Sequence, residues 1–188
     1  MVLGRKPPLV VDVGAADGYY SLGFASRLPE ARHVSFEMLE DSRSALQRCA
    51  EKLETSIEIR GLCRPEDLVE VVGSSKRGFL LMDCEGAERE LLAGSVVPLL
   101  AEWTVLLEVH DGHAPGVGEE IQQRYSLSHD IEVIWTRDPT AADFRAVLSW
   151  PLNHYCKDVM RRTCEEGRGV PMRFFFMTPR VENGGRAS

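Results

Sequence analysis

The amino-acid sequence predicts a single α/β domain built on a mostly parallel β-sheet. Short apolar runs alternate along the chain with amphipathic stretches, and no internal repeat interrupts this alternation. A length of 188 residues suits one domain, and a hydrophobic content of 44% is sufficient for a buried core. We therefore expect one domain over residues 1–181, followed by a polar, glycine-rich and flexible tail at 182–188.

The first half of the chain alternates predicted strands with predicted helices. The apolar run at 9–13 follows two prolines and indicates a buried strand, and the helix after it should end near Pro29. Pro65 lies at the favoured first turn of a short helix. In chain order we expect a strand at 9–13, a helix at 18–28, a strand at 33–38, a helix at 41–53, a strand at 57–63, a helix at 66–72 and a strand at 79–83.

The second half of the chain adds three predicted strands and a long connection. The strands are expected at 104–109, 131–135 and 173–177, with a helix at 119–125. The connection between the last two strands is long for a link inside a compact domain. We interpret residues 138–170 as an inserted cap that contains one helix at 157–164, and not as a separate domain.

Charge and cysteine content exclude several classes of protein. The net charge of −7 disfavours a general nucleic-acid binder, which usually presents a basic face. No apolar run is long enough to span a membrane, and the first residues lack the apolar segment of a signal peptide. The cysteines are scattered and form no C-x-x-C pair, which indicates reduced thiols in a cytoplasmic protein. They are Cys49, Cys63, Cys84, Cys156 and Cys164.

The glycine-containing turn after the first strand carries the most functional information. Residues 11–21 read VDVGAADGYYS, so a buried strand ends in a turn of small residues and a helix begins soon after it. Small residues let the backbone approach a ligand closely, and a helix N-terminus offers N–H groups to a carboxylate or phosphate. Asp12 is a charge within the apolar strand, so its burial requires a partner such as the cationic amino group of a ligand.

Glu37 lies at the expected end of the second strand, where an acidic side chain can accept both hydroxyls of a ribose. Nucleotide-dependent dehydrogenases and methyltransferases share this feature, but their turns differ. Dinucleotide sites prefer G-x-G-x-x-G, whereas Gly14, Ala16 and Gly18 occupy every second position. That spacing is the methyltransferase form with alanine as its middle residue. It favours a Rossmann-like domain that binds S-adenosylmethionine.

Two later strands end in acidic residues and a histidine. Asp83 ends the fourth strand, and Glu85 and Glu88 follow it in a turn and a first helical turn. Glu108 and His110 share one side of the fifth strand by alternation. Ligands of open α/β sheets bind beyond the carboxyl ends of strands, so we expect Asp83 and His110 to face the same crevice as the glycine turn. The alternative is that Glu85 or Glu88 only complements a helix dipole and that His110 is structural.

Together these motifs resemble the FkbM-type family of class I methyltransferases. The family pattern is roughly D-x-G-A-N-x-G-Y-Y-S, then F-E, then K-x-D-x-E-G-x-E, and finally E-x-H. This chain has corresponding residues at 12–21, 36–37, 83–88 and 108–110, in the same order within 9–112. It departs from the pattern at Ala16, where the family often has asparagine, and at Leu81, where it often has lysine. Asp17 could supply the polar contact that Ala16 lacks.

The resemblance implies a fold, a cofactor and an activity. It implies a seven-stranded sheet in the order 3-2-1-4-5-7-6, with the last strand antiparallel and helices on both faces. It also implies S-adenosylmethionine as donor, S-adenosylhomocysteine as product and O-methylation of a hydroxyl. Asp12, Gly14 and Ala15 would hold the methionine part and Glu37 the ribose. The other expected cofactor-binding residues are Met38, Leu62 and Cys63 at the adenine, together with Ala16, Asp17, Tyr20, Ser21 and Asp83.

Methyl transfer to a hydroxyl requires alignment of the acceptor and removal of its proton. We assign His110 or Asp83 as the base. The expected acceptor is a small molecule or a sugar, contacted by Glu85, His110, Trp150, His154 and Tyr155. The three residues in the cap could equally form a hydrophobic cluster on the sheet. We expect no nucleic-acid or membrane partner, and the sequence leaves a homodimer open.

Three alternatives compete with this interpretation. A Mg²⁺-assisted version would use Asp83 with His110 or Asp111 at adjacent strand ends, which resembles catechol O-methyltransferase. We do not expect a metal, because Mg²⁺ favours oxygen ligands and His110 is a poor fit. Outside this class, the chain could be an NAD-dependent oxidoreductase, which the turn spacing disfavours. It could also be a binding module that kept the cofactor site without catalysis.

Overall fold

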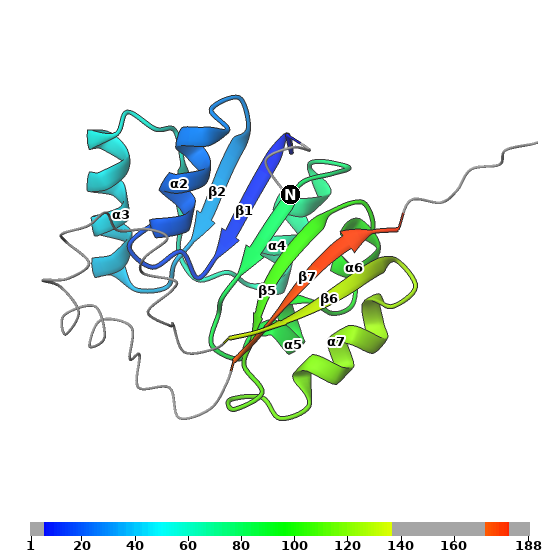
Figure 1. Cartoon of the computed structure of the whole chain (residues 1–188). Helices are drawn as coiled ribbons and strands as arrows, with labels where there is room; N and C mark the ends of the chain where they lie inside the picture. Colours follow the sequence, from blue (N-terminus) through cyan, green and yellow to red (C-terminus); the bar gives the residue numbers. More distant parts are fainter. Residues whose placement is uncertain (1–5, 137–171, 181–188) are drawn as a thin grey trace, which may run out of the picture.

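Seven strands form one sheet in the computed structural model of the protein, which describes residues 6–136 and 172–180 (Figure 1). The strands are β1 (Leu9–Val13), β2 (Arg32–Phe36), β3 (Glu58–Arg60), β4 (Phe79–Met82), β5 (Thr104–Val109), β6 (His129–Trp135) and β7 (Arg173–Pro179). Their order is β3-β2-β1-β4-β5-β7-β6, and only β7 runs antiparallel to its neighbours. This order and the reversed last strand confirm the predicted Rossmann-like sheet.

Helices cover both faces of the sheet, as predicted. They are α2 (Tyr19–Arg27), α3 (Glu40–Lys52), α4 (Pro65–Gly73), α5 (Glu88–Leu91), α6 (Val96–Leu99) and α7 (Val117–Tyr125). Figure 1 shows α2 and α3 together on one side, and α4 to α7 on the other. The parallel strands all end at one edge, and the first helix starts directly beyond that edge.

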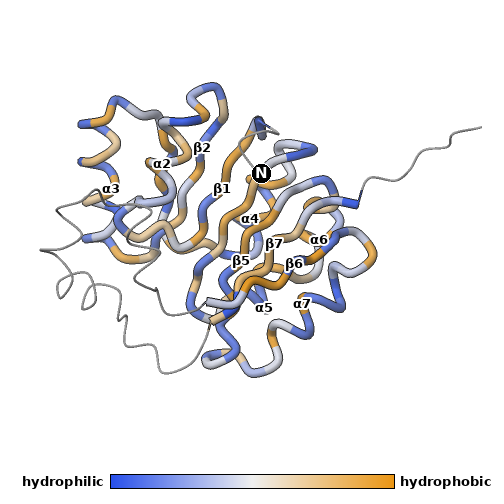
Figure 2. Tube along the Cα trace, in the orientation of Figure 1, coloured by the Kyte–Doolittle hydropathy of each residue, from blue (hydrophilic) through white to orange (hydrophobic). Residues whose placement is uncertain are grey.

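The core lies mainly between the central strands and the helices α4, α6 and α7. The apolar strands run through the middle of the molecule in Figure 2, and the fully buried side chains there include Trp103, Phe36 and Phe175. A smaller cluster on the opposite face joins Phe79 of β4 to Leu28 and α2. Burying this apolar surface supplies the main driving force for folding, at roughly 25 cal/mol per Å².

The main differences from the sequence prediction lie at the sheet edge and in two short helices, and the other bounds differ by at most two residues. β1 and β5 have the predicted bounds. β3 keeps only three residues, because it is an edge strand that pairs with β2 alone, at 58–60. The helix α5 corresponds to the helical turn expected at Glu88, and α6 was not predicted. Each has only four residues, and Gly94 lies between them.

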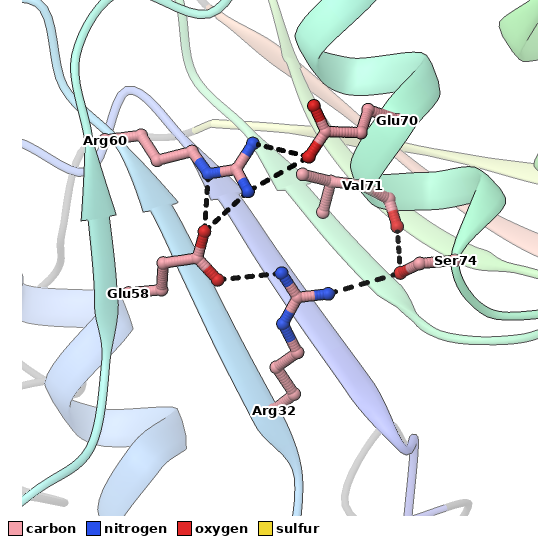
Figure 3. Close-up of polar contacts among 6 residues, drawn as sticks. All are labelled: Arg32, Glu58, Arg60, Glu70, Val71 and Ser74. Atoms are coloured by element: carbon pink, nitrogen blue, oxygen red, sulfur yellow. Dashed lines mark hydrogen bonds and ion pairs between the residues drawn. The ribbon is translucent and has the colours of Figure 1, made fainter.

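A network of exposed charges joins the edge of the sheet to α4 (Figure 3). Arg32 of β2 and Arg60 of β3 both pair with Glu58, and Arg60 also reaches Glu70 of α4 at 3.2 Å. Ser74 accepts a hydrogen bond from Arg32 and donates one to the carbonyl of Val71. Exposed pairs of this kind contribute about 1 kcal/mol or less each. Their charges also disfavour pairing of the short β3 edge with another chain.

Several predicted features lie outside the described residues. These are the cap at 138–170 with its helix at 157–164, the tail at 182–188, and the side chains of Trp150, His154 and Tyr155. Cys156 and Cys164 also fall there. Among residues 6–136 and 172–180, no helix has the length and apolar character needed to cross a membrane.

Trp103 provides a test of the core. Its side chain is fully buried, and its indole N–H donates to the carbonyl of Ser75 at 3.3 Å. A Cβ added at Gly78 would meet the ring at 2.4 Å, so the indole fills its space completely. Trp103→Ala should lower the free energy of unfolding by about 3–5 kcal/mol, because it leaves a cavity. Urea titration followed by circular dichroism measures this loss.

The matched control is Trp135→Ala at the end of β6. Trp135 is 58% exposed and contacts Arg173 through its ring. Its removal should cost about 1 kcal/mol or less. Equal losses for the two variants would contradict the position of Trp103 in the core.

Candidate active site

The turn between β1 and α2 is pressed against the ends of two neighbouring strands. The N–H groups of Gly14 and Ala15 donate to the carbonyl of Phe36 at 2.9 and 3.0 Å. Gly14 has a φ of +88°, and a Cβ there would lie 1.7 Å from the carbonyl oxygen of Asp83. Any residue with a side chain would clash with backbone at this point, so only glycine permits the close approach.

The helix α2 begins without a side-chain cap. Its N-cap residue is Gly18, in the left-handed region at φ 96°, and no side-chain hydrogen bond caps it. An uncapped N-terminus leaves N–H groups of the first turn available to a carboxylate or phosphate. The turn therefore joins a close backbone approach to a helix N-terminus, as predicted from its sequence.

Glu37 connects this turn to the end of β2. Its side chain is buried, and its two carboxylate oxygens accept hydrogen bonds from the N–H groups of Ala16 (2.9 Å) and Leu39 (2.7 Å). Each oxygen of a carboxylate has two acceptor positions, so both can still accept a ribose hydroxyl. The bond from Ala16 was not foreseen, and it is made by a non-glycine residue with a left-handed φ of 48°.

Apolar side chains are exposed beside Glu37. Met38 and Leu62 follow the ends of β2 and β3, and they are 65% and 54% exposed. These two strands are neighbours, so the side chains flank the same part of the edge. Cys63 is half-buried there, and burial raises the pKa of its thiol to about 12, which keeps it neutral. This surface fits a flat, apolar ring such as adenine.

Asp12 is buried inside the sheet beneath the turn. It is 3% exposed and accepts a hydrogen bond of 2.5 Å from the Ser21 hydroxyl, which also contacts Ser35 at 2.8 Å. Burial raises its pKa to about 6; Ser21 opposes this rise, and the charges of Asp83 and Glu37 add to it. The sequence predicted a cationic group of a ligand as the partner of Asp12. The structure gives Asp12 the Ser21 hydroxyl of α2, and the cationic partner stays a prediction.

Two exposed aromatic residues begin α2. The rings of Tyr19 and Tyr20 meet edge to face at 5.1 Å. Burial, followed by the charges of Tyr19, Glu108, Asp83 and Asp12, raises the pKa of the Tyr20 phenol. Tyr20 therefore senses the negative charge of the acidic groups at the strand ends, whereas Asp17 is exposed in the turn.

Asp83, Glu108 and His110 come together at the ends of β4 and β5. Each contributes one nitrogen or oxygen atom that could bind a metal ion, and these three atoms lie within 4.8 Å of one another. Burial raises the pKa of Asp83 to about 6; Glu108 adds to the rise and His110 opposes it. These three residues could surround a cation. The expectation that no metal takes part stays a prediction.

Asp111 does not belong to this group. Its carboxylate accepts hydrogen bonds from Arg173 at 2.8 Å and from the N–H of Gly118 at 3.2 Å. The structure therefore brings His110, and not Asp111, to the end of β4 beside Asp83.

His110 lies between carboxylates on both sides of its ring. Nδ1 is 2.5 Å from Oε1 of the fully buried Glu88, and Nε2 is 3.4 Å from Oδ1 of Asp83 and 3.6 Å from Oε2 of Glu85. Burial lowers the pKa of His110, but the hydrogen bond with Glu88 and the surrounding negative charges outweigh it, so the net pKa is raised. Glu88 was not assigned to the site from the sequence, although it belongs to the Glu-Gly-x-Glu pattern.

The structure thus brings most of the predicted site residues to one edge of the sheet. The turn and Glu37 lie at the ends of β1 and β2, and the residues around His110 lie at the ends of β4 and β5. The three cap residues Trp150, His154 and Tyr155 are outside the described residues, so their place in an acceptor pocket stays a prediction.

Known structures share this fold. An O-methyltransferase from Streptomyces achromogenes, TomG, involved in tomaymycin synthesis and solved with S-adenosylmethionine, matches with a TM-score of 0.58 and 11% identity over 94% of this chain and 76% of its own. A precorrin-6y C5,15-methyltransferase from Geobacter metallireducens matches with a TM-score of 0.57 and 12% identity over 94% and 85% of the two chains.

A third match is an O-methyltransferase from Bacillus cereus, solved with S-adenosylhomocysteine. Its TM-score is 0.54, with 13% identity over 72% of this chain and 70% of that one. These likenesses establish that the chain has the fold of methyltransferases. No protein-family model matches the sequence, and no curated protein is similar to it, so the resemblance to the FkbM-type family stays a prediction.

The buried Asp12 predicts a particular dependence of stability on pH. The pKa of Asp12 is about 6 in the folded protein and 3.8 for an unperturbed aspartate. Between these pH values the folded state therefore binds more protons than the unfolded state. Ionisation therefore destabilises the fold as the pH rises from about 4 to about 6. Asp12→Asn removes this cost. The variant's free energy of unfolding, relative to that of the unchanged protein, should rise over this interval by up to about 3 kcal/mol.

Urea titrations at pH 4 and pH 7.5 measure this difference. Asp17→Asn changes an exposed carboxylate in the same turn and controls for the change in net charge. If the free energies of unfolding of Asp12→Asn and the unchanged protein differ by the same amount at both pH values, Asp12 does not have a raised pKa in the folded protein.

Proposed function

We propose that the chain binds S-adenosylmethionine beyond the carboxyl ends of β1, β2 and β4, and that it methylates a hydroxyl of a small molecule or sugar. The observation that carries this proposal is the β1–α2 turn. Gly14 packs directly on the carbonyl of Asp83, and Glu37 accepts a hydrogen bond from the N–H of Ala16 in the same turn. This combination sets a turn of small residues and an uncapped helix N-terminus next to an acidic acceptor, which fits a nucleoside with an attached amino acid.

The residues present fit each part of the cofactor. The backbone of Gly14 and Ala15 and the start of α2 would receive the methionine part, and Glu37 the two ribose hydroxyls. Met38, Leu62 and Cys63 would cover the adenine. Asp12 contributes negative charge beneath the turn, and Ser21 acts through Asp12 because its hydroxyl points to that carboxylate.

Negative charge at the strand ends supports a cationic cofactor. Burial is the main cause of the raised pKa values of Asp12 and Asp83, and nearby carboxylates add to both, whereas His110 opposes the rise at Asp83. When bound, S-adenosylmethionine supplies an activated methyl group on a positively charged sulfur. The carboxylates of Asp83 and Glu108 would stabilise that charge nearby.

We assign His110 as the residue that accepts the acceptor's proton, with Asp83 beside it. The Nε2 atom of His110 is buried and makes no hydrogen bond within the described residues, and it faces Asp83. A histidine has the right intrinsic basicity for proton transfer near neutral pH. Alignment of acceptor and cofactor can contribute roughly 7–11 kcal/mol. The matched motifs at 12–21, 83–88 and 108–110 support the FkbM-type family as the narrower assignment.

Binding of S-adenosylhomocysteine tests this proposal. Isothermal titration calorimetry at pH 7.5 should show saturable 1:1 binding to the unchanged protein. Glu37→Gln keeps one acceptor oxygen but loses the charge, so it should weaken binding by at least about 10-fold, as expected for hydrogen bonds to a charged group. The same titration with NAD should show no binding.

Glu40→Gln is the matched control, because Glu40 is an exposed glutamate three positions further along at the start of α3. It should bind as the unchanged protein does. Absence of heat with saturating S-adenosylhomocysteine would overturn the proposal, and binding of NAD in its place would identify a dinucleotide site.

A further inference from the structure

Glu88 is a buried carboxylate that the proposed function does not use. It is the first residue of α5, and its side chain is fully buried although it lies next to an open turn. A carboxylate that only complements a helix terminus needs no burial, and burial of an unpaired charge is costly. Glu88 therefore needs a partner whose interaction offsets the cost of burying the carboxylate.

The backbone before Glu88 is shaped to turn it inward. Glu85 and Gly86 follow β4 with φ values of 53° and 109°, so two consecutive residues adopt the left-handed region. The N–H of Gly86 donates to Oε1 of Glu88 at 3.2 Å. A Cβ at Gly86 would lie 3.1 Å from Cβ of His113, so the turn also packs closely against the segment after β5. This reversal places Glu88 beneath the end of β5.

The partner of Glu88 is His110. The Nδ1 atom lies 2.5 Å from Oε1 of Glu88. Burial raises the pKa of Glu88, but the hydrogen bond with His110, the backbone N–H groups of Glu88 and Gly86 and the charge of His110 together outweigh it, so the net pKa is lowered. A carboxylate only accepts, so Nδ1 must carry the proton. In a neutral imidazole the Nε2 atom is then the unprotonated nitrogen, and it lies on the side of Asp83 and Glu85.

The other charged groups around His110 do not compete for Nδ1. Asp83 and Glu85, from the end of β4 and the turn after it, contact Nε2 at 3.4 and 3.6 Å. His113 stacks on the ring with centroids 5.9 Å apart, and Glu108 lies two residues back on the same strand. Glu88 is thus the one group that the structure gives for Nδ1 among the described residues.

We propose that Glu88 is a positioning residue, which holds His110 in the tautomer with Nδ1 protonated and Nε2 directed at the acceptor hydroxyl. This inference rests on the proposed function, because it gives that reaction its proton acceptor in a fixed orientation. The proton of the acceptor hydroxyl goes to Nε2 as the oxygen forms its bond to the methyl carbon, and the carbon–sulfur bond breaks. Glu88 stabilises the resulting imidazolium through the hydrogen bond at Nδ1.

Nuclear magnetic resonance of ¹⁵N-histidine-labelled protein tests the tautomer directly. At alkaline pH, where the ring is neutral, the unchanged protein should show His110 with a protonated Nδ1 and an unprotonated Nε2. Glu88→Ala should shift His110 towards the Nε2-protonated form that predominates for free imidazole side chains. Glu88→Gln should restore the Nδ1 form, because its amide oxygen can still accept. His110→Gln assigns the signals.

Glu90→Ala is the control on the same helix, because Glu90 is exposed, and it should leave the spectrum unchanged. An unchanged His110 tautomer in Glu88→Ala would overturn the proposal. So would selective broadening of the Nε2 signal by one equivalent of Mn²⁺, because Nε2 would then be a metal ligand and not a proton acceptor.

Calorimetry with S-adenosylhomocysteine on the same samples separates this inference from the proposed function. Glu88→Ala should bind S-adenosylhomocysteine within about twofold of the unchanged protein, since the Glu88 carboxylate bonds to His110 and to the N–H of Gly86 and not to the glycine turn. If no sample binds it while the tautomer shifts as expected, the cofactor assignment fails and the Glu88–His110 contact stands.

Discussion

The site depends on the contact between Gly14 and the carbonyl of Asp83. No Cβ fits in that contact, so the turn after β1 lies directly against the end of β4. The same contact fixes where α2 begins, and with it where Ser21 and Tyr20 lie. The hydrogen bond from Ala16 to Glu37 extends this arrangement to β2. One steric constraint thereby orders three adjacent strand ends.

The negative charge of the site is the second constraint on the structure. Asp12, Asp83 and Glu108 are held close together, and burial and mutual repulsion raise the pKa values of Asp12 and Asp83. Such a cluster is costly in the protein alone, and a bound cation relieves it. His110 is the one basic group among them, and Glu88 holds it from below. The charges of the site are thus matched to a positively charged cofactor and to the transfer of a proton away from an acceptor.

The sequence was informative where a feature is local. The apolar run of β1, the glycine spacing and Glu37 at the next strand end each lie within one short segment, and the structure places them as predicted. Contacts that depend on two distant segments were missed. The bond from Ser21 to Asp12 requires α2 to pack over β1, and the contact of Glu88 with His110 requires the left-handed turn at Glu85 and Gly86. No periodicity encodes either one.

A crystal structure of the chain with S-adenosylhomocysteine tests the central claim most directly. The account predicts electron density for the amino acid part over Gly14, ribose hydroxyls within hydrogen-bond distance of Glu37, and adenine between Met38 and Leu62. It also predicts that the sulfur lies on the side of Asp83 and His110. Density at another place on the molecule, or a ligand whose ribose does not reach Glu37, would contradict the account.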